Sequence, residues 1–273
     1  MRIVCVANQK GGVGKTTTVA GLAGAFAASG RSVLMLDLDP QASLTHWFGL
    51  DESPPRVGTY DLYAASEKPR TLDVAEITYP LTEARVALAP AQAGLATLER
   101  SAASRPNLGR TLIQAFSDAH LPYDYVLFDC PPTFGSLMIS ALAAADLVLI
   151  PTQTEPLALQ ALDGMLRTVS MVERSRKHTL PVVIVPSMYD RRTRVAQDSL
   201  AALRARTACT VWDEEIPVDT RLREASRNGA SPEQFDAQSR GANAFARLAA
   251  WIATNVSANS ENSDENSTEE RAA

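Results

Sequence analysis

The chain has 273 residues, 45% of them hydrophobic and 21% charged, which is typical of a soluble globular protein with a substantial core. The net charge of −5 excludes a uniformly basic nucleic-acid-binding protein, although residues 167–247 hold fourteen Lys or Arg against ten Asp or Glu, a net +4. Three widely separated cysteines exclude a disulfide framework and a CxxC zinc site, and they indicate a reducing, cytoplasmic setting.

Apolar runs of strand length alternate with longer segments of helical periodicity. The predicted strands are Ile3–Ala7, Ser32–Leu38, Val86–Ala89, Tyr125–Asp129, Leu147–Pro151 and Val182–Pro186. The predicted helices are Lys15–Ser29, Asn107–His120, Phe134–Ala144, Leu157–Arg174, Val195–Thr207 and Ala242–Asn255. Several strands are apolar throughout, as strands buried on both faces are. This alternation predicts an α/β fold in which helices cover both faces of a mostly parallel twisted sheet.

The first strand leads into VANQKGGVGKTTT, residues 6–18, which ends like a phosphate-binding loop. Its three glycines let successive backbone N–H groups face phosphate oxygens, and the start of the following helix adds its positive dipole end. Lys15 is expected to reach the β- and γ-phosphates, Thr16 to ligate Mg²⁺ and Thr17 to support the α-phosphate side. The glycine usual at position 9 is missing, and a second lysine follows it. The predicted nucleotide-binding residues here are Gly11, Gly12, Val13, Gly14, Lys15, Thr16 and Thr17, and the family resemblance described next adds Lys10.

The stretch KGGVGKTT, residues 10–17, resembles the deviant Walker A motif of the ParA/MinD family of ATPases, and the resemblance extends over residues 1–255. In that family the lysine that matches Lys10 crosses a dimer interface and touches the phosphates of ATP bound to the partner subunit. The resemblance therefore implies a P-loop NTPase fold, ATP and Mg²⁺ as cofactors, and a homodimer in the ATP state. It implies catalytic roles for Lys10 and Lys15.

Two carboxylates follow the second strand in LMLDLDPQAS, residues 34–43, at the edge of the sheet where open α/β folds bind ligands. On a continuing strand Asp37 and Asp39 would face the same side. Their match to the family's DxDPQ motif implies that Asp37 belongs to the Mg²⁺ shell and that Asp39, the third catalytic residue, orients the attacking water. The alternative is a pair of acids that cap the turn before a helix at Ala42.

An apolar strand ends in an acid in YDYVLFDCPP, residues 123–132, which is the Walker B pattern. Asp129 is expected to hold Mg²⁺ through water, so that the predicted metal residues are Thr16, Asp37 and Asp129. The neighbouring Cys130 raises the alternative of an iron–sulfur reductase on the same fold. Such reductases need further cysteine ligands, so a buried, inert thiol is the expectation.

Three later segments also resemble the family. LIPTQTEPLALQAL, residues 149–162, places Gln153 and Glu155 on the predicted dimer face. VPSMYD, residues 185–190, and EIPVD, residues 215–219, resemble the segments that enclose the adenine. The nucleotide-binding residues predicted there are Pro186, Met188, Pro217 and Asp219.

Two basic stretches, DRRTRVAQ and DTRLREASRNG, lie in the basic half of the chain. ParA-like proteins bind DNA without sequence preference through the basic surface of the dimer, and such binding is directed to the backbone and depends on salt. Arg192 and Arg221 match the family's arginines, and Arg194, Arg223 and Arg227 could widen the patch. The alternative is an arginine-rich surface that only contacts solvent.

The last 18 residues, 256–273, contain five acids, one base and almost nothing apolar, which predicts an acidic disordered tail after an ATPase domain of residues 1–255. Such a tail has no apolar face and would be repelled from an anionic bilayer, which disfavours the MinD-like, membrane-associated branch. A strand that starts at residue 2 also disfavours a preceding helix-turn-helix.

The sequence as a whole predicts a cytoplasmic, nucleoid-associated ATPase that dimerises on ATP, binds DNA nonspecifically and positions a cargo. A ParB-like or cargo-adaptor protein would stimulate hydrolysis. The cargo would be a plasmid, a chromosome or a protein cluster, and the motifs resemble those of ParC-like members that place chemotaxis arrays. A small-molecule ligase or kinase with a related phosphate loop is a further alternative.

Overall fold

The computed structural model describes residues 1–51, 56–65, 72–105, 107–117, 121–176, 179–206 and 209–255. Their strands form one eight-stranded sheet in the order β3-β4-β2-β5-β1-β6-β7-β8, and every neighbouring pair is parallel except β3–β4. The strands are β1 Arg2–Val6, β2 Val33–Asp37, β3 Tyr79–Pro80, β4 Val86–Ala89, β5 Tyr125–Asp129, β6 Leu147–Gln153, β7 Val182–Ser187 and β8 Thr210–Val211. The predicted fold class is confirmed.

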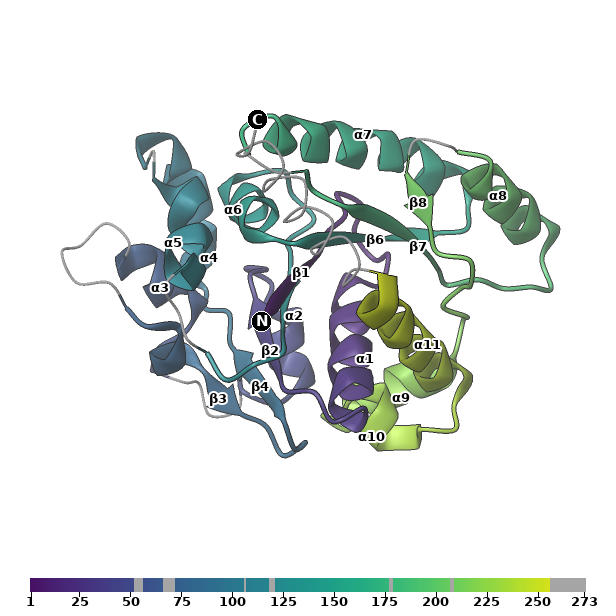
Figure 1. The fold of residues 1–273 in the computed structure, drawn as a ribbon, viewed down its shortest axis with the longest axis horizontal. Coiled ribbons are helices and arrows are strands. Elements are labelled where there is room, and N and C mark those ends of the chain that lie inside the picture. Colours follow the sequence, from purple (N-terminus) through teal and green to yellow (C-terminus); the bar gives the residue numbers. More distant parts are fainter. Residues whose placement is uncertain are drawn as a thin grey trace, which may run out of the picture.

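Helices fill most of the connections between strands (Figure 1). They are α1 Lys15–Ala28, α2 Ser43–Trp47, α3 Thr59–Ala65, α4 Gly94–Ser101, α5 Thr111–Ser117, α6 Ser136–Ala144, α7 Pro156–Glu173, α8 Arg194–Arg204, α9 Thr220–Arg227, α10 Pro232–Asp236 and α11 Arg240–Asn255. Short 3₁₀ turns span Val74–Ile77, Ala102–Ser104 and Leu108–Arg110.

All six predicted strands form, and their ends move by no more than two residues. The sequence missed β3 and β8, because strands of two residues carry no alternating pattern. It also missed the short helices α2, α3, α4 and α10. The helix predicted over residues 107–120 was wrong at its start, where a 3₁₀ turn precedes α5.

Several predictions fall partly or wholly outside the described residues. The loop expected over residues 49–58 is described only at its two ends, and the predicted helix ends at His120 and Thr207 are not described. The acidic tail, residues 256–273, lies wholly outside them. Among the described helices none is both long enough and apolar enough to cross a lipid bilayer.

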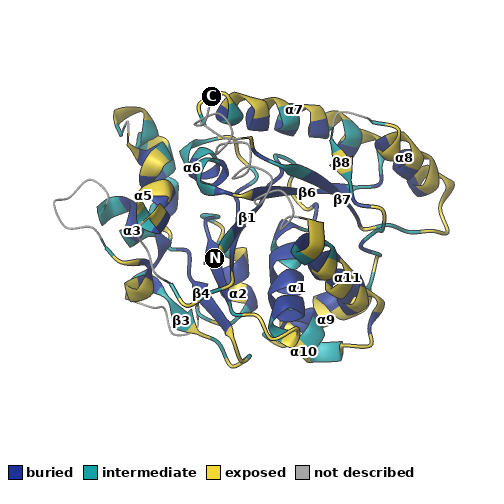
Figure 2. Ribbon diagram, viewed as in Figure 1, coloured by how far each residue is buried: buried dark blue, intermediate teal, exposed yellow. Residues whose placement is uncertain are grey.

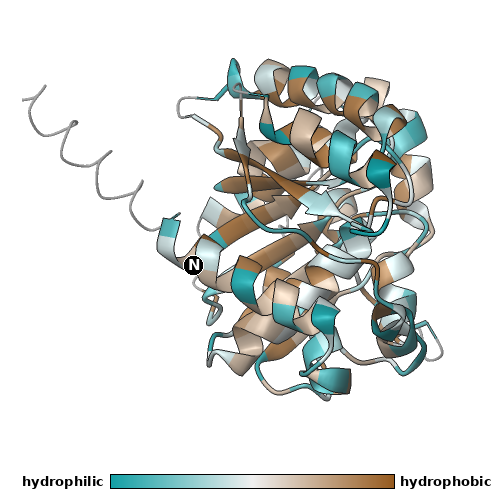
Figure 3. Ribbon diagram, turned by 90° about the vertical axis from the view of Figure 1, so that its right-hand side faces the viewer, coloured by the Kyte–Doolittle hydropathy of each residue, from teal (hydrophilic) through white to brown (hydrophobic). Residues whose placement is uncertain are grey.

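The sheet separates two hydrophobic clusters, and alternate residues of each strand enter one or the other. In β1, Ile3 and Cys5 pack with α4, α5, α6 and α7, whereas Val4 and Val6 pack with α1 and α11. Figure 2 shows the buried strands between helices whose outer faces are exposed, and Figure 3 shows the same contrast in hydropathy. Burial on both faces explains why these strands are apolar throughout.

Helix α11 packs closely on α1, the helix that follows the phosphate loop. A Cβ atom at Gly21 of α1 would lie 2.3 Å from the ring of Phe245 in α11, so only glycine permits this approach. The contact fixes α1 from the side opposite the sheet. It also brings the C-terminal part of the described chain to the element that carries Lys15.

Candidate functional site

The loop between β1 and α1 turns sharply at Gly12 and Gly14, whose φ angles are +73° and +92°. These left-handed conformations suit glycine, because other residues would place a Cβ against the backbone. A Cβ built on Gly11 or Gly12 would meet no atom within 4 Å, so the space above the loop is open. The glycine-rich turn predicted from the sequence therefore has the required shape and faces free space.

Side chains from neighbouring strand ends hold this loop in place. The Asn8 amide donates to the Pro151 carbonyl over 2.8 Å, and its oxygen accepts from Lys10 N at 2.9 Å. The Ser187 hydroxyl donates to the Val13 carbonyl over 2.9 Å. The sequence analysis did not single out Asn8 or Ser187. Their only sequence signal is that polar side chains end or follow otherwise apolar strands.

Lys15 and Thr16 begin α1. The Lys15 side chain is buried, and its Nζ lies 3.3 Å from the Lys10 carbonyl. Burial lowers the pKa of Lys15, while the nearby carboxylates Asp129 and Asp39 act in the opposite direction. A buried cation at a helix N-terminus, beside an open loop of backbone N–H groups, is suited to an anionic ligand.

Asp37 and Asp129 end neighbouring strands and are paired in register between β2 and β5. Both are fully buried, and burial raises the pKa of each, to about 6 for Asp37 and well above its usual value for Asp129. Two carboxylates this close also disfavour each other's charged form. The sheet thus brings together two predicted metal residues that are 92 positions apart in the chain.

The two acids have different partners. Asp37 Oδ2 accepts hydrogen bonds from Thr45 N at 2.9 Å and Thr45 Oγ1 at 2.7 Å, and its Oδ1 accepts from Asp39 N at 3.1 Å. Asp129 Oδ2 accepts from Thr16 Oγ1 at 2.7 Å, whereas its buried Oδ1 has no hydrogen-bond partner within the described residues. Asp37 therefore anchors the loop that holds Asp39, and Asp129 keeps one oxygen available.

The Thr16–Asp129 pair fits Mg²⁺. This ion prefers oxygen ligands and is usually held by one or two protein groups together with water and substrate phosphates. A threonine hydroxyl, an unpartnered carboxylate oxygen and an open phosphate loop supply that donor set. The charge of a divalent cation would also offset the free-energy cost of burying the Asp129 carboxylate.

Asp39 lies just beyond β2, half-buried, so the strand does not continue to it as the i, i+2 argument assumed. Its Oδ1 accepts from Gln41 N at 2.9 Å, which shapes the turn before α2. Burial raises the pKa of Asp39, and Lys15 counteracts this. The acid thus stabilises a turn, as the alternative proposed, and also lies close enough to Lys15 to interact with its charge.

Lys10 is bound within its own chain. Its Nζ donates to Gln153 Oε1 at 3.0 Å and forms a salt bridge with Glu155, the residue that precedes α7. Gln153 also donates to the Gly12 carbonyl at 3.1 Å. A Lys10 side chain that reaches another subunit must first leave these two partners.

A cavity of about 370 Å³ opens beside Gly14 and Thr17. Of the predicted adenine-enclosing residues, Met188, Pro217 and Asp219 line it. Pro186 does not. It is buried in β7, and its carbonyl accepts from Ile216 N at 2.8 Å, which positions the segment that forms the wall.

The cavity wall includes residues that the sequence analysis missed or placed elsewhere. Trp47, at the end of α2, lines it and donates its Nε1 hydrogen to the Ala230 carbonyl at 2.9 Å. Arg223, predicted to contact DNA, also lines it. Both Asp219 oxygens are engaged, because they accept from Arg221 N and Gly241 N and so cap α9 and support the start of α11.

The segments that lead into the two basic stretches lie side by side. Tyr189 forms a β-bridge with Pro217, and Val218 N donates to the Tyr189 carbonyl at 3.1 Å. Arg192 forms a two-pronged ion pair with Asp190 and lowers the pKa of that carboxyl to about 2. Arg221 pairs with Glu224 and Asp236, and Arg194 lies 3.6 Å from Asp198.

These ion pairs are exposed and therefore weak. The guanidinium groups can exchange their carboxylate partners for phosphates. Within the described chain, Arg223 and Arg227 form no ion pair. The arginines thus come from two segments that meet at Tyr189 and Pro217, one leading into α8 and the other forming α9, and Arg223 lies at the cavity.

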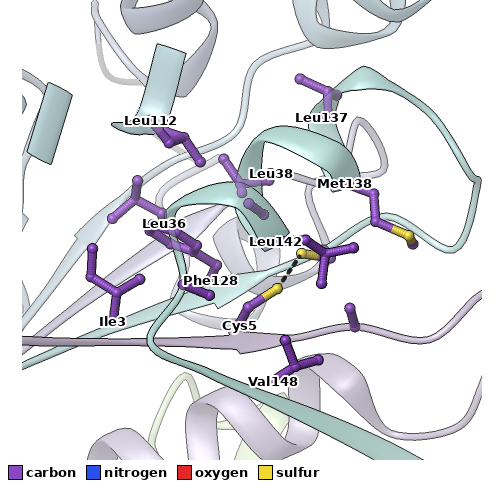
Figure 4. Close-up of a cluster of buried hydrophobic side chains, with 14 of the residues drawn as sticks. Ile3, Cys5, Leu36, Leu38, Leu112, Phe128, Leu137, Met138, Leu142 and Val148 are labelled. Carbon is purple, nitrogen blue, oxygen red and sulfur yellow. Dashed lines mark hydrogen bonds between the residues drawn. The ribbon is translucent and has the colours of Figure 1, made fainter. Parts of the chain in front are cut away.

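Cys5 and Cys130 meet in the core beneath the site, with their sulfur atoms 3.4 Å apart (Figure 4). Both thiols are completely buried, and contact with Cys5 together with burial raises the pKa of Cys130. Cys209 lies apart, next to the edge strand β8. The described residues contain no group of three or more His, Cys, Asp or Glu side chains placed to hold a metal ion.

Comparison with known proteins agrees with this geometry. Residues 1–182 match a family described as an AAA domain. The chain is 35% identical to the chromosome partitioning protein ParA of Caulobacter vibrioides over 91% of this chain and 92% of that one. It is 33% identical to the sporulation initiation inhibitor protein Soj of Bacillus subtilis over 93% and 99% of the two chains.

Solved structures are similar as well. One is titled cobyrinic acid a,c-diamide synthase from Mycobacterium smegmatis with bound ADP and magnesium. It superposes with a TM-score of 0.77 at 32% identity and covers 91% of this chain and 92% of that one.

Proposed function

Since this chain belongs to the ParA/MinD family of P-loop ATPases, we propose that it hydrolyses ATP with Mg²⁺ and uses the ATP state to dimerise on DNA and position a cargo. One observation carries the proposal: Lys15, Thr16 and the unpartnered Oδ1 of Asp129 meet beside a cavity large enough for a nucleoside. Ligand pockets commonly measure about 300–1,000 Å³.

Different residues would bind different parts of Mg·ATP. Residues 10–14 present backbone N–H groups, Lys15 supplies a buried positive charge, and Met188 and Pro217 enclose the base. Thr16 and Asp129 would hold Mg²⁺, which neutralises phosphate charge when bound. Asp37 keeps the Asp39 loop in place, and Asp39 would orient the attacking water.

Lys10 supports the proposed dimer. In the single chain it is held by Gln153 and Glu155, at the edge of the sheet where the phosphate loop is open. The phosphates of a nucleotide in a second subunit would replace the Glu155 carboxylate as its anionic partner. ATP occupancy then becomes a dimer switch, because the intersubunit contact depends on the bound nucleotide.

The paired basic stretches support nonspecific DNA binding on the nucleoid. Arg192, Arg194, Arg221 and Arg227 are exposed, and guanidinium groups suit phosphate contacts. A ParB-like or cargo-adaptor protein would stimulate hydrolysis and release the dimer. The cargo would be a plasmid, a chromosome or a protein cluster such as a chemotaxis array.

A second candidate is a small-molecule ligase, because the similar Mycobacterium structure is that of a cobyrinic acid a,c-diamide synthase. The same experiment separates the two. Purified protein is assayed for DNA binding with and without Mg·ATP at fixed salt, together with Lys15→Ala, Arg192→Glu and the exposed-arginine control Arg174→Ala.

We expect ATP-dependent DNA binding by the parent and by Arg174→Ala. Lys15→Ala should lose both nucleotide and DNA binding, because the buried charge beside the phosphate loop is gone. Arg192→Glu should lose DNA binding alone. ATP-dependent DNA binding by Lys15→Ala would refute the proposal, and its absence in the parent would favour the ligase.

A further inference from the structure

Helix α9 lines the cavity proposed to take the nucleotide and also carries Arg221, one of the arginines proposed to bind DNA. Leu222, Arg223 and Ser226 line the cavity, at helix spacings of one and four residues. Arg221 points elsewhere, toward Glu224 and toward Asp236 of α10. Residues two apart on a helix differ by about 200° in direction, so Arg221 and Arg223 cannot serve the same surface.

Among the described residues that line this cavity, Arg223 is the one whose charged group has no hydrogen-bond or ion-pair partner. Only one other described lining residue is charged, Asp219, and both of its oxygens accept backbone hydrogen bonds. The Arg223 guanidinium makes no hydrogen bond or ion pair within the described residues, although the side chain is exposed and can reach a ligand. Because Asp219 caps α9, the attraction for an anion at this wall comes from the Arg223 side chain.

The neighbours of Arg223 indicate which part of a ligand it meets. The same cavity is lined by Gly14 and Thr17, next to Lys15 and Thr16, which are expected to receive the terminal phosphates. The apolar wall of Met188, Pro217 and Val218 suits a base. The part of a nucleotide that joins these two regions is the α-phosphate with its ribose.

We propose that Arg223 binds the α-phosphate of the nucleotide and not DNA, which places nucleotide and DNA contacts on the two sides of α9. This inference rests on the proposed function, since it assumes that the cavity takes a nucleotide. It differs from the prediction that Arg223 widens the DNA patch. It also gives a physical link between the two ligands, because the helix that touches the nucleotide also carries Arg221.

The experiment compares Arg223→Ala, Arg223→Lys, Arg221→Ala and the control Arg174→Ala in the full chain. Calorimetry measures the dissociation constant for Mg·ADP, and a second titration measures DNA affinity at saturating Mg·ATP. We expect Arg223→Ala to weaken ADP binding about tenfold, consistent with the loss of one exposed hydrogen bond to a charged group. Arg223→Lys should retain most of the affinity, because the positive charge remains.

The reverse pattern is expected for Arg221→Ala, which should weaken DNA binding and leave ADP affinity as in Arg174→Ala. Circular dichroism without nucleotide checks that each variant is folded, which we expect since Arg223 makes no described contact. An ADP affinity that is unchanged in Arg223→Ala, or a DNA affinity that falls in this variant at saturating nucleotide, would overturn the inference. Loss of ADP binding in Lys15→Ala would show that the proposed function survives that result.

Discussion

Asp129→Asn should stabilise the nucleotide-free protein and remove its stabilisation by Mg·ADP. The carboxylate is 1% exposed, and only one of its oxygens has a hydrogen-bond partner, Thr16, within the described residues. An asparagine oxygen can keep the Thr16 bond, and the substitution removes a buried negative charge that faces Asp37.

The size of the effect follows from two opposing contributions. A buried polar group without a partner costs about 1–3 kcal/mol. Removing the buried charge should raise the free energy of unfolding. The unpaired asparagine NH₂ and the loss of a negative neighbour for Lys15 offset part of this rise, so we expect a net increase of about 1–2 kcal/mol. For a domain of this size that corresponds to an increase in Tm of about 2–8 °C.

Ligand binding should change in the opposite direction. Mg·ADP at one hundred times its dissociation constant stabilises the parent by about 2.7 kcal/mol, or roughly 5–11 °C in Tm. The variant lacks the carboxylate proposed to hold Mg²⁺, so most of this shift should disappear. Thermal unfolding followed by circular dichroism, in EDTA and in Mg·ADP, measures both effects.

The pH dependence has a defined sign. Burial and Asp37 raise the pKa of Asp129 in the folded state, so the stability that this group contributes at low pH is lost as the pH rises. The advantage of Asp129→Asn should therefore grow between pH 5 and pH 8. Asp198→Asn, at an exposed site, is the control. A lower Tm for Asp129→Asn in EDTA, with an unchanged response to Mg·ADP, would refute the reasoning.

Three further substitutions test other parts of the structure. Asp39→Ala should bind ATP but hydrolyse it about 10²–10⁴-fold more slowly in a phosphate-release assay, and normal turnover would remove its catalytic role. Glu155→Gln should remove the salt bridge of Lys10, leave its hydrogen bond to Gln153, and lower the dissociation constant of the ATP-dependent dimer by up to about thirtyfold in sedimentation, since an exposed pair contributes about 0–1 kcal/mol and two pairs open per dimer. Glu83→Gln should raise Tm at pH 8 and not at pH 4, because burial raises the pKa of Glu83 and its stabilising effect is lost on deprotonation; equal shifts at both pH values would contradict this.

The sequence was most informative where local pattern and burial agree. Strands buried on both faces must be apolar throughout, so β1, β2 and β5 could be located from composition alone. The phosphate loop was equally clear, because its glycines and its GKT act through local backbone geometry. Elements of five to eight residues such as α2 and α4 were missed, since their positions depend on packing more than on periodicity.

The contacts that join distant segments could not be predicted. Register between β2 and β5 places Asp37 opposite Asp129, and the hydrogen bonds around the pair show that Asp37 anchors the Asp39 loop while Oδ1 of Asp129 has no partner among the described residues. The orientation of α9 decides that Arg223 faces the cavity, although its sequence context is that of a surface arginine.

Sequence alone therefore determined the fold class, the phosphate loop and the residue types of the site, because these follow from hydrophobic pattern and local backbone chemistry. Tertiary structure decided which side chain meets which. It places Lys10 in a salt bridge with Glu155, and it forms a cavity that both Thr17 and Arg223 line. These results depend on strand order and helix packing, which bring residues more than a hundred positions apart within hydrogen-bonding distance.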